Sequence, residues 1–258
     1  MDTLSLELYQ YGFVVLAAVA AGVVNALAGG GTLITFPMLT VVGLSAVSAN
    51  VTNTVALLPG YIGGTLAQAN DLKGQERRLW WFIPAGLVGG LLGGYLLLIS
   101  GEKLFRQLVP FLILMASLLL AVQEPVKAWL TRRMKEHAAK APEEAGALVL
   151  GLAAIYGGYF GAGLGVIILA ALGFVVEDTL TRLNAIKQAI SFAANIAAAV
   201  FFVFSGPVVW SVALVMAVGA LVGGSLGGRL AGRVKPSTLR WVVVTIGVVV
   251  SLIYFVRG

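Results

Sequence analysis

The sequence has 258 residues, of which 59% are hydrophobic and only 11% are charged, and its mean hydropathy is +0.98. A soluble domain carries about 25% charged residues, so this composition excludes an ordinary soluble domain. Apolar runs close to the ~20 residues that cross a bilayer recur along the whole chain. The composition therefore predicts an all-α integral membrane protein.

Cysteine is absent and histidine occurs once, as His137 in a basic loop. These counts exclude disulfides and thiolate metal sites and disfavour a histidine metal centre, so we expect neither a metal nor a cofactor. The net charge of +6 lies mostly in loops. Such charges set membrane orientation and contact lipid, and they do not indicate nucleic-acid binding.

The first predicted element is a hairpin over residues 12–44. Three consecutive glycines, Gly29 to Gly31, break its helix shortly after Asn25. The piece is short for two full crossings of about 20 residues each. We therefore predict a re-entrant pair of half-helices whose tip lies at membrane depth, where protein or a water-filled cavity must surround it. Three helices follow, at about 46–69, 80–99 and 104–122.

A polar connection occupies residues 123–143 and carries several lysines and arginines. Val126, Trp129, Leu130 and Met134 are spaced so that this segment would form an amphipathic helix on the membrane surface. The alternative is a solvated linker, and the sequence leaves both open.

The pattern of the first half then recurs. A second hairpin is predicted over 145–176, with its break at Gly161 to Gly165. The helices predicted after it lie at about 182–205, 208–230 and 239–256. Residues 1–122 and 144–258 are therefore read as two repeats joined by the 123–143 linker.

A shared offset supports the repeat. Leu87–Gly94 and Leu221–Gly228 agree at seven of eight positions when the chain is shifted by 134 residues. The same shift places Asn50 on Asn184, Asn53 on Lys187 and Thr54 on Gln188. One offset shared by separate features makes a chance match of glycine-rich segments improbable.

Charges then orient the repeats. The basic loops at 70–79, 123–143 and 229–240 are predicted to be cytoplasmic by the positive-inside rule. One hairpin and three crossings in each half bring all three loops to the same side. The second repeat is then inverted relative to the first, and both termini are predicted to lie outside.

Lys187 lies inside the apolar run of 182–205. In a helix, Asn184, Lys187, Gln188, Ser191 and Asn195 share one face. A cation near the middle of a membrane helix costs about 2.5–3.5 kcal/mol, so it should face a wet cavity or a partner. This predicts an anion pathway; the alternative is that Lys187 snorkels to the headgroups and only anchors the helix.

Inverted repeats with broken helices are typical of transporters that bind substrate near the midplane. Half-helices that begin at the two breaks would direct N–H groups and positive dipole ends at an anion. No buried Asp or Glu stands out, which disfavours a cation site. The predicted substrate-binding residues are Gly30, Gly31, Thr32, Asn50, Asn53, Thr54, Gly163, Gly165, Asn184, Lys187, Gln188 and Asn195. For Gly86, Gly90 and Gly94 and for Gly219, Gly223 and Gly227, the small-xxx-small spacing instead indicates tight helix packing.

Three segments resemble the TauE/SafE family of sulfite and organosulfonate exporters. They are Leu27-Ala-Gly-Gly-Gly-Thr-Leu-Ile-Thr-Phe-Pro37, Thr52-Asn-Thr-Val-Ala-Leu-Leu-Pro-Gly60 and Leu183-Asn-Ala-Ile-Lys-Gln188. The resemblance covers nearly the whole chain. It implies export of a small sulfur oxyanion or organosulfonate, such as sulfite or sulfoacetate, through the inner membrane. It also implies that Asn53, Thr54, Asn184 and Lys187 lie near the substrate.

The function hypothesis is thus a secondary carrier that exports such an anion by alternating access, with lipid and the small anionic substrate as its partners. The alternatives are an anion channel, or a carrier of another small oxyanion or carboxylate. A membrane-embedded enzyme is disfavoured because no nucleophile–base pair or carboxylate dyad lies at membrane depth. A non-transporting receptor is disfavoured by the polar faces that point into the bundle. The oligomeric state stays open.

Overall fold

The computed structural model describes the chain except for residues 1–6, 28, 136–141, 231, 232, 234 and 258, and the described part is helical with no strand. Its α-helices are α1 (Leu8–Leu27), α2 (Thr32–Val41), α3 (Ala46–Ala67), α4 (Glu76–Ala121), α5 (Gln123–Lys135), α6 (Glu143–Tyr159), α7 (Leu164–Val175), α8 (Leu180–Ser205), α9 (Trp210–Leu230) and α10 (Pro236–Arg257). A short 3₁₀ helix, η1 (Ala69–Leu72), follows α3.

Among the described residues, five helices are long and apolar enough to cross a membrane: α1, α4, α8, α9 and α10. Two shorter apolar helices, α2 and α7, lie among them. The prediction of an all-α membrane protein is confirmed.

The long helix α4 consists of two arms that meet at Gly101, whose φ of 68° is outside the helical range and suits glycine. This is the turn predicted between the helices at 80–99 and 104–122. The carboxylate of Glu102, just after the bend, accepts hydrogen bonds from the N–H groups of Ala46 (2.6 Å) and Val47 (2.9 Å) at the start of α3. An anionic side chain at a helix N-terminus is favourable, so these contacts hold the bend beside α3.

Both predicted hairpins form two helices joined at a glycine break, but their arms are unequal. The arms α1 and α6 have 20 and 17 residues, whereas α2 and α7 have 10 and 12. Helix α1 is about 30 Å long at 1.5 Å per residue, so it is longer than the half-helix expected. The reason is that the apolar run begins at Leu8 and nothing interrupts it before the glycines.

The connection after α4 contains the helix α5, which was one of the two alternatives for this segment. It packs against α7: Leu130 is almost fully buried, and a Cβ on Gly173 would lie 2.6 Å from its Cδ2. The rings of Trp129 and Phe174 lie 4.9 Å apart. The amphipathic helix therefore forms and covers α7; the rest of the predicted linker, residues 136–141, lies outside the described part.

Glycines bring helices into backbone contact. A Cβ on Gly223 of α9 would lie 2.0 Å from the carbonyl oxygen of Val19 in α1, and one on Gly93 of α4 would lie 2.0 Å from that of Ile155 in α6. Side chains cannot occupy such positions, so α1 packs closely on α9 and α4 on α6. The packing role expected for the glycine repeats is thus visible at Gly223.

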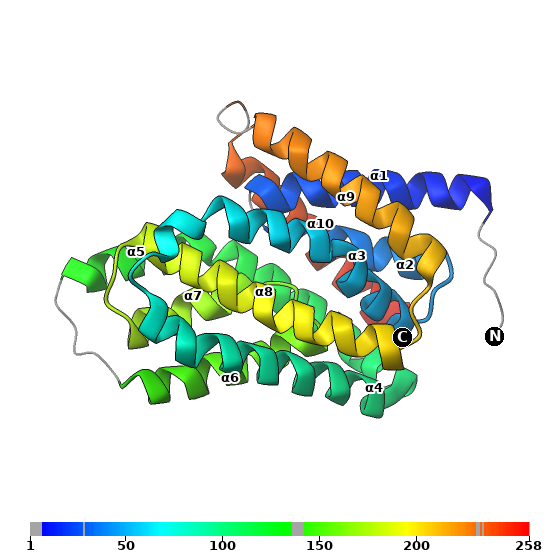
Figure 1. Ribbon diagram of the computed structural model, residues 1–258. Coiled ribbons are helices and arrows are strands. Elements are labelled where there is room, and N and C mark those ends of the chain that lie inside the picture. Colours follow the sequence, from blue (N-terminus) through cyan, green and yellow to red (C-terminus); the bar gives the residue numbers. More distant parts are fainter. Residues whose placement is uncertain (1–6, 28, 136–141, 231–232, 234, 258) are drawn as a thin grey trace.

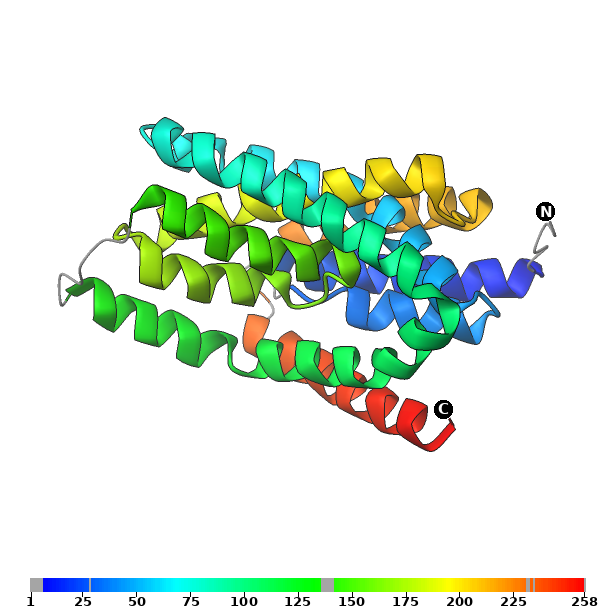
Figure 2. The same cartoon turned by 90° about the horizontal axis from the view of Figure 1, so that it is seen from below.

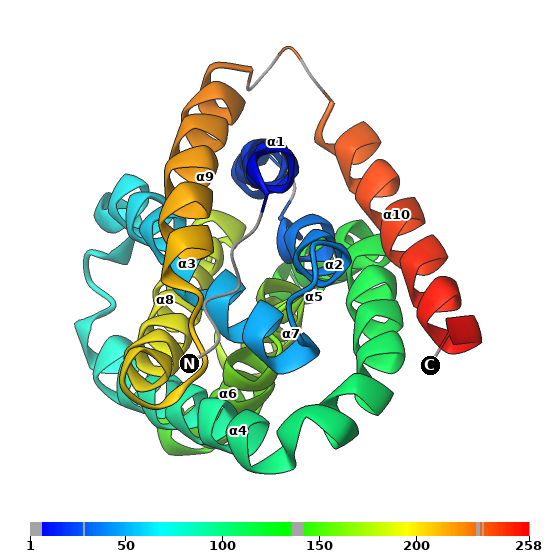
Figure 3. The ribbon, with the colours of Figure 1, turned by 90° about the vertical axis from the view of Figure 1, so that its right-hand side faces the viewer.

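Most helices run lengthwise along the molecule (Figure 1), whereas α9 and α10 are inclined to α1, which Figure 3 shows end-on. Helix α1 begins and α10 ends at one end of the bundle (Figure 1). The opposite end, here called the basic end, holds the connections before α4 and before α8. At one edge of the molecule α10 lies beside the second arm of α4 (Figure 2). Near the start of α10, Arg240 is buried and pairs with Glu124 of α5 at 2.8 Å.

Candidate functional site

The two glycine breaks pack on the same turns of one helix. A Cβ on Gly30 would lie 2.6 Å from Cδ2 of Leu120, and one on Gly163 would lie 3.3 Å from Cβ of Leu119. Both leucines belong to the last turns of α4. Segments about 130 residues apart in the chain are therefore brought together inside the bundle.

The first break carries a neutral polar cluster. Its Gly31 N–H donates to Oδ1 of Asn25 at 2.7 Å. From α3, Asn53 accepts a hydrogen bond from the Thr35 hydroxyl (2.5 Å) and donates to the Thr32 hydroxyl (3.4 Å). Asn53 is only 2% exposed. Helix α2 thus begins against a buried asparagine that is bonded on both its amide atoms.

The second break is surrounded by groups from α3, α6 and α8. Asn50 of α3 donates to the carbonyl of Tyr159 at 3.0 Å, and the Tyr156 hydroxyl donates to that of Ala162 at 2.5 Å. From α8, Oδ1 of Asn195 would lie 3.9 Å from a Cβ on Gly161. The carbonyls exposed by the end of α6 are therefore bonded by side chains, as buried backbone groups require.

Lys187 lies beside the beginning of α7. Its Cδ would be 3.6 Å from a Cβ on Gly165, and its ammonium donates to Oδ1 of Asn184 at 3.1 Å. Asn184 in turn donates to the carbonyl of Leu180 at 2.9 Å. Lys187 comes seven residues after the start of α8, about 10 Å along its axis. A cation thus lies, partly buried, at the N-terminal turn of a short helix.

The predicted site residues separate into two groups. Gly30, Gly31, Thr32 and Asn53 gather at the first break, and Asn50, Gly163, Gly165, Asn184, Lys187 and Asn195 at the second. Thr54 bonds the carbonyl of Asn50 within its own helix at 2.9 Å, and Gln188 is half-buried next to Lys187.

Sequence reasoning missed four polar contributors: Asn25, Thr35, Tyr156 and Tyr159. For Thr35 a signal existed, because it lies one turn after Thr32 on the same face of α2. Asn25 precedes the break by only a few residues, and this proximity was the available signal. Tyr159 contributes its backbone carbonyl, which residue type alone does not reveal.

Two buried polar atoms near the second break have no hydrogen-bond partner: Oδ1 of Asn50 and Oγ of Ser191. Both side chains are at least nine-tenths buried. Ser191 lies one turn after Lys187 on the same face of α8. Buried polar atoms normally have a partner, and these two have none among the described residues.

No carboxylate balances the charge of Lys187 within the helices. The aspartates and glutamates of the described residues lie at helix ends, at the α4 bend or in connections. No group of three or more potential metal ligands occurs in the described part of the chain. The polar side chains gathered at the second break are thus one ammonium, several amides and a hydroxyl.

Comparisons with known proteins show the family to which the chain belongs. The family model described as sulfite exporter TauE/SafE matches residues 14–254. A probable membrane transporter protein of Haemophilus influenzae is 26% identical over 201 residues, covering 78% of this chain and 77% of that protein. The probable membrane transporter protein ORF9 of a Sinorhizobium species is 28% identical over 228 residues (85% and 81%).

The probable membrane transporter protein YfcA of Escherichia coli K12 is 26% identical over 212 residues, which is 81% of this chain and 76% of that protein. No solved structure matches the chain. The matched family model spans nearly the whole bundle, including both breaks and Lys187. The chain therefore belongs to the sulfite exporter TauE/SafE family and is a multi-pass membrane transporter.

Proposed function

We propose that this protein is a secondary carrier that exports a small sulfur-containing anion, sulfite or an organosulfonate, across the cytoplasmic membrane. The observation that carries the proposal is the placement of Lys187 against the first turn of α7, with no acidic partner among the described residues of the helices. A lone cation at a helix N-terminus attracts an anion. The unpartnered Ser191 hydroxyl would donate to an oxygen of the anion, whereas Oδ1 of Asn50 would accept from a water molecule or a hydroxyl of the solute.

Alternating access would come from two inverted repeats, residues 1–122 and 144–258. The pairing of helices supports this. Helix α1 of the first repeat packs on α9 of the second, and α6, the counterpart of α1 in the second repeat, packs on α4 of the first. The helices α3 and α8 run in opposite directions (Figure 1). The basic end would face the cytoplasm, and the opposite end, where α1 begins and α10 ends, would face the outside.

The function is tested by counterflow in proteoliposomes. Vesicles loaded with unlabelled isethionate should accumulate labelled isethionate transiently, with a saturable initial rate, because a carrier exchanges one substrate molecule for another. Flux that does not saturate, accompanied by single-channel currents, would establish a channel instead. A chain that moves neither isethionate nor sulfite would refute the proposed substrate class.

The charge balance favours solutes with one negative charge. Lys187 supplies one full positive charge and the N-terminus of α7 about half a charge more, so a divalent anion would remain under-compensated in a poorly solvated site. We expect sulfite uptake to fall as pH rises through the second dissociation of sulfurous acid, while isethionate uptake stays level. Initial rates of both solutes measured in parallel over that pH range check this; equal rates for both ionic forms of sulfite would contradict it.

A further inference from the structure

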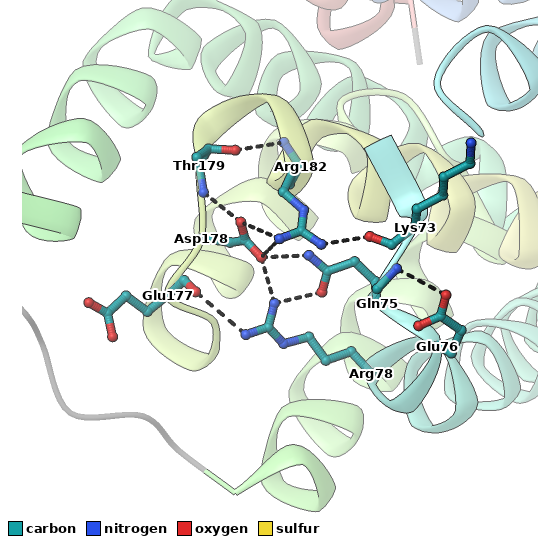
Figure 4. Close-up of polar contacts among 9 residues, drawn as sticks. Lys73, Gln75, Glu76, Arg78, Glu177, Asp178, Thr179 and Arg182 are labelled. Atoms are coloured by element: carbon teal, nitrogen blue, oxygen red, sulfur yellow. Dashed lines mark hydrogen bonds and ion pairs between the residues drawn. The ribbon is translucent and has the colours of Figure 1, made fainter. Parts of the chain in front are cut away.

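A polar network at the basic end joins the loop before α4 to the loop before α8 (Figure 4). Its centre is Asp178. Its carboxylate accepts hydrogen bonds from Nε2 of Gln75 (2.5 Å), Nη1 of Arg78 (2.7 Å) and the N–H of Thr179 (2.8 Å). Arg182, one turn into α8, approaches the same carboxylate at 3.4 Å. One carboxylate therefore holds four donors from two separate parts of the chain.

Further contacts strengthen the same network. Arg182 donates to the carbonyl of Lys73 at 2.7 Å, and Arg78 donates to that of Glu177 at 3.5 Å and to Oε1 of Gln75 at 2.6 Å. A cavity of about 440 Å³ at the basic end is lined by the network side chains of Gln75, Arg78, Asp178 and Arg182, by Gly74 and Glu177, and by the Arg77–Glu143 pair. The two loops are thus bonded to each other through side chains and backbone.

This network differs from an ordinary surface ion pair. The side chain of Asp178 is 9% exposed and that of Arg78 is 20% exposed, whereas Arg77 in its nearby pair with Glu143 is 84% exposed. Burial raises the pKa of Asp178, but hydrogen bonds from Gln75, Thr179 and Arg78 and the charge of Arg182 hold it below its usual value. The carboxylate is therefore ionised at neutral pH, and its contacts are screened less than those of an exposed pair.

The network lies at the ends of the two helices that carry the polar site. Asp178 and Thr179 precede α8, which carries Lys187, and the joined loop lies between α3, which carries Asn50, and α4. At the other end of the bundle, Ser48 of α3 donates to the carbonyl of Pro207 at 2.8 Å, and Thr52 accepts from the N–H of Val209 at 3.0 Å. The end of α8 that leads to α9 is therefore bonded to α3, and the end where α8 begins is bonded to the loop before α4. Each set of contacts must separate before that end can open.

We propose that the Asp178 network is the gate at the basic end: its contacts hold α8 against the loop before α4 and close the path to Lys187, and they break when the carrier opens to that side. The proposal rests on the proposed carrier function. The contacts at the opposite end are made by neutral hydroxyl and backbone groups, so loss of the Asp178 charge weakens one end only. Asp178, Gln75, Arg78 and Arg182 act on the site by positioning α8 and do not touch the anion.

The chain contains no cysteine, so one introduced thiol reports access directly. In a Ser191→Cys background the thiol lies buried one turn beyond Lys187. Adding Asp178→Asn should increase its labelling by a membrane-impermeant thiol reagent, applied at the basic end, about fivefold or more, the lower range of typical coupling between sites. Labelling from the opposite end should not increase. The matched control is Glu143→Gln, which removes the exposed pair at the same end.

Gln75→Leu is the second gate variant, because it removes two contacts of the network and leaves every charge in place. Thermal unfolding confirms which variants fold. If Asp178→Asn does not fold, the labelling rate of Gln75→Leu tests the gate. Folded gate variants that label no faster than Ser191→Cys alone, or no faster than the Glu143→Gln control, would overturn the gate. Labelling needs no anion flux, so a chain that transports no sulfonate but shows faster labelling refutes the function and not the gate.

Discussion

Lys187→Met is expected to lower sulfonate flux by about 100-fold or more and to leave the amount of folded protein unchanged. The Lys187 ammonium lies about two turns inside α8. Its hydrogen bond goes to the side-chain amide oxygen of Asn184, at 3.1 Å. Hydrogen bonds to a charged group contribute about 1.5–3 kcal/mol each, and two of them to a sulfonate account for the factor of 100. Methionine keeps the length and apolar stem of the side chain and removes its charge.

Folding should not suffer, because replacing a buried charge by an apolar group in a membrane helix is neutral or favourable. The matched control is Lys103→Met, which removes an exposed lysine next to the α4 bend at the other end of the bundle. Initial rates in proteoliposomes and the Tm of each variant are measured together. If Lys187→Met transports at the rate of Lys103→Met, Lys187 only anchors α8 to the headgroups.

Gly90→Ala is expected to destabilise the bundle, with a Tm lower by roughly 3–10 °C. A Cβ on Gly90 would lie 2.1 Å from the carbonyl oxygen and 2.6 Å from the Cα of Ala194 in α8. These are backbone atoms, so α4 and α8 must move apart rather than a side chain turning aside. Overpacking of this kind costs about 1–3 kcal/mol, and each kcal/mol lowers Tm by about 2–4 °C in a chain of this size.

Gly224 offers the control, because it is the counterpart of Gly90 when the chain is shifted by 134 residues. Nothing lies within 4 Å of a Cβ built on it. Both glycines are inside helices, where alanine is the better helix former by about 1 kcal/mol. Gly224→Ala should therefore keep or raise the Tm. Equal losses at the two positions would mean that the close approach of α4 and α8 is not what requires glycine at Gly90.

Much of the fold follows from the order of apolar and polar residues. The bend at Gly101, the helix with Lys187 on its polar face and the breaks at both glycine clusters were predicted because each depends on one short segment. The short α2 also follows from its sequence, since it ends just before Gly43, whose φ is 102°. Helix α5 was left open because its spacing fits two outcomes, and only Gly173 and Phe174 of α7 decide between them.

The grouping of the site residues could not be predicted in this way. Periodicity shows which residues share a helix face, but it does not show which face of another helix they meet. Asn50 and Asn53 were predicted to belong to one substrate site, yet Asn50 bonds the Tyr159 carbonyl at the second break while Asn53 bonds Thr35 at the first. The Asp178 network was missed for the same reason, since Gln75 is 103 residues away in the chain.

The most direct test of the anion site is a structure of the protein with 2-bromoethanesulfonate, in which the bromine is located by its anomalous scattering. The account predicts the sulfonate within hydrogen-bond distance of the Lys187 ammonium, beside the first turn of α7 at Gly165 and near Ser191. A bromine peak in the cavity of the Asp178 network, or at the surface of the bundle with the Lys187 ammonium bonded only to Asn184, would contradict it.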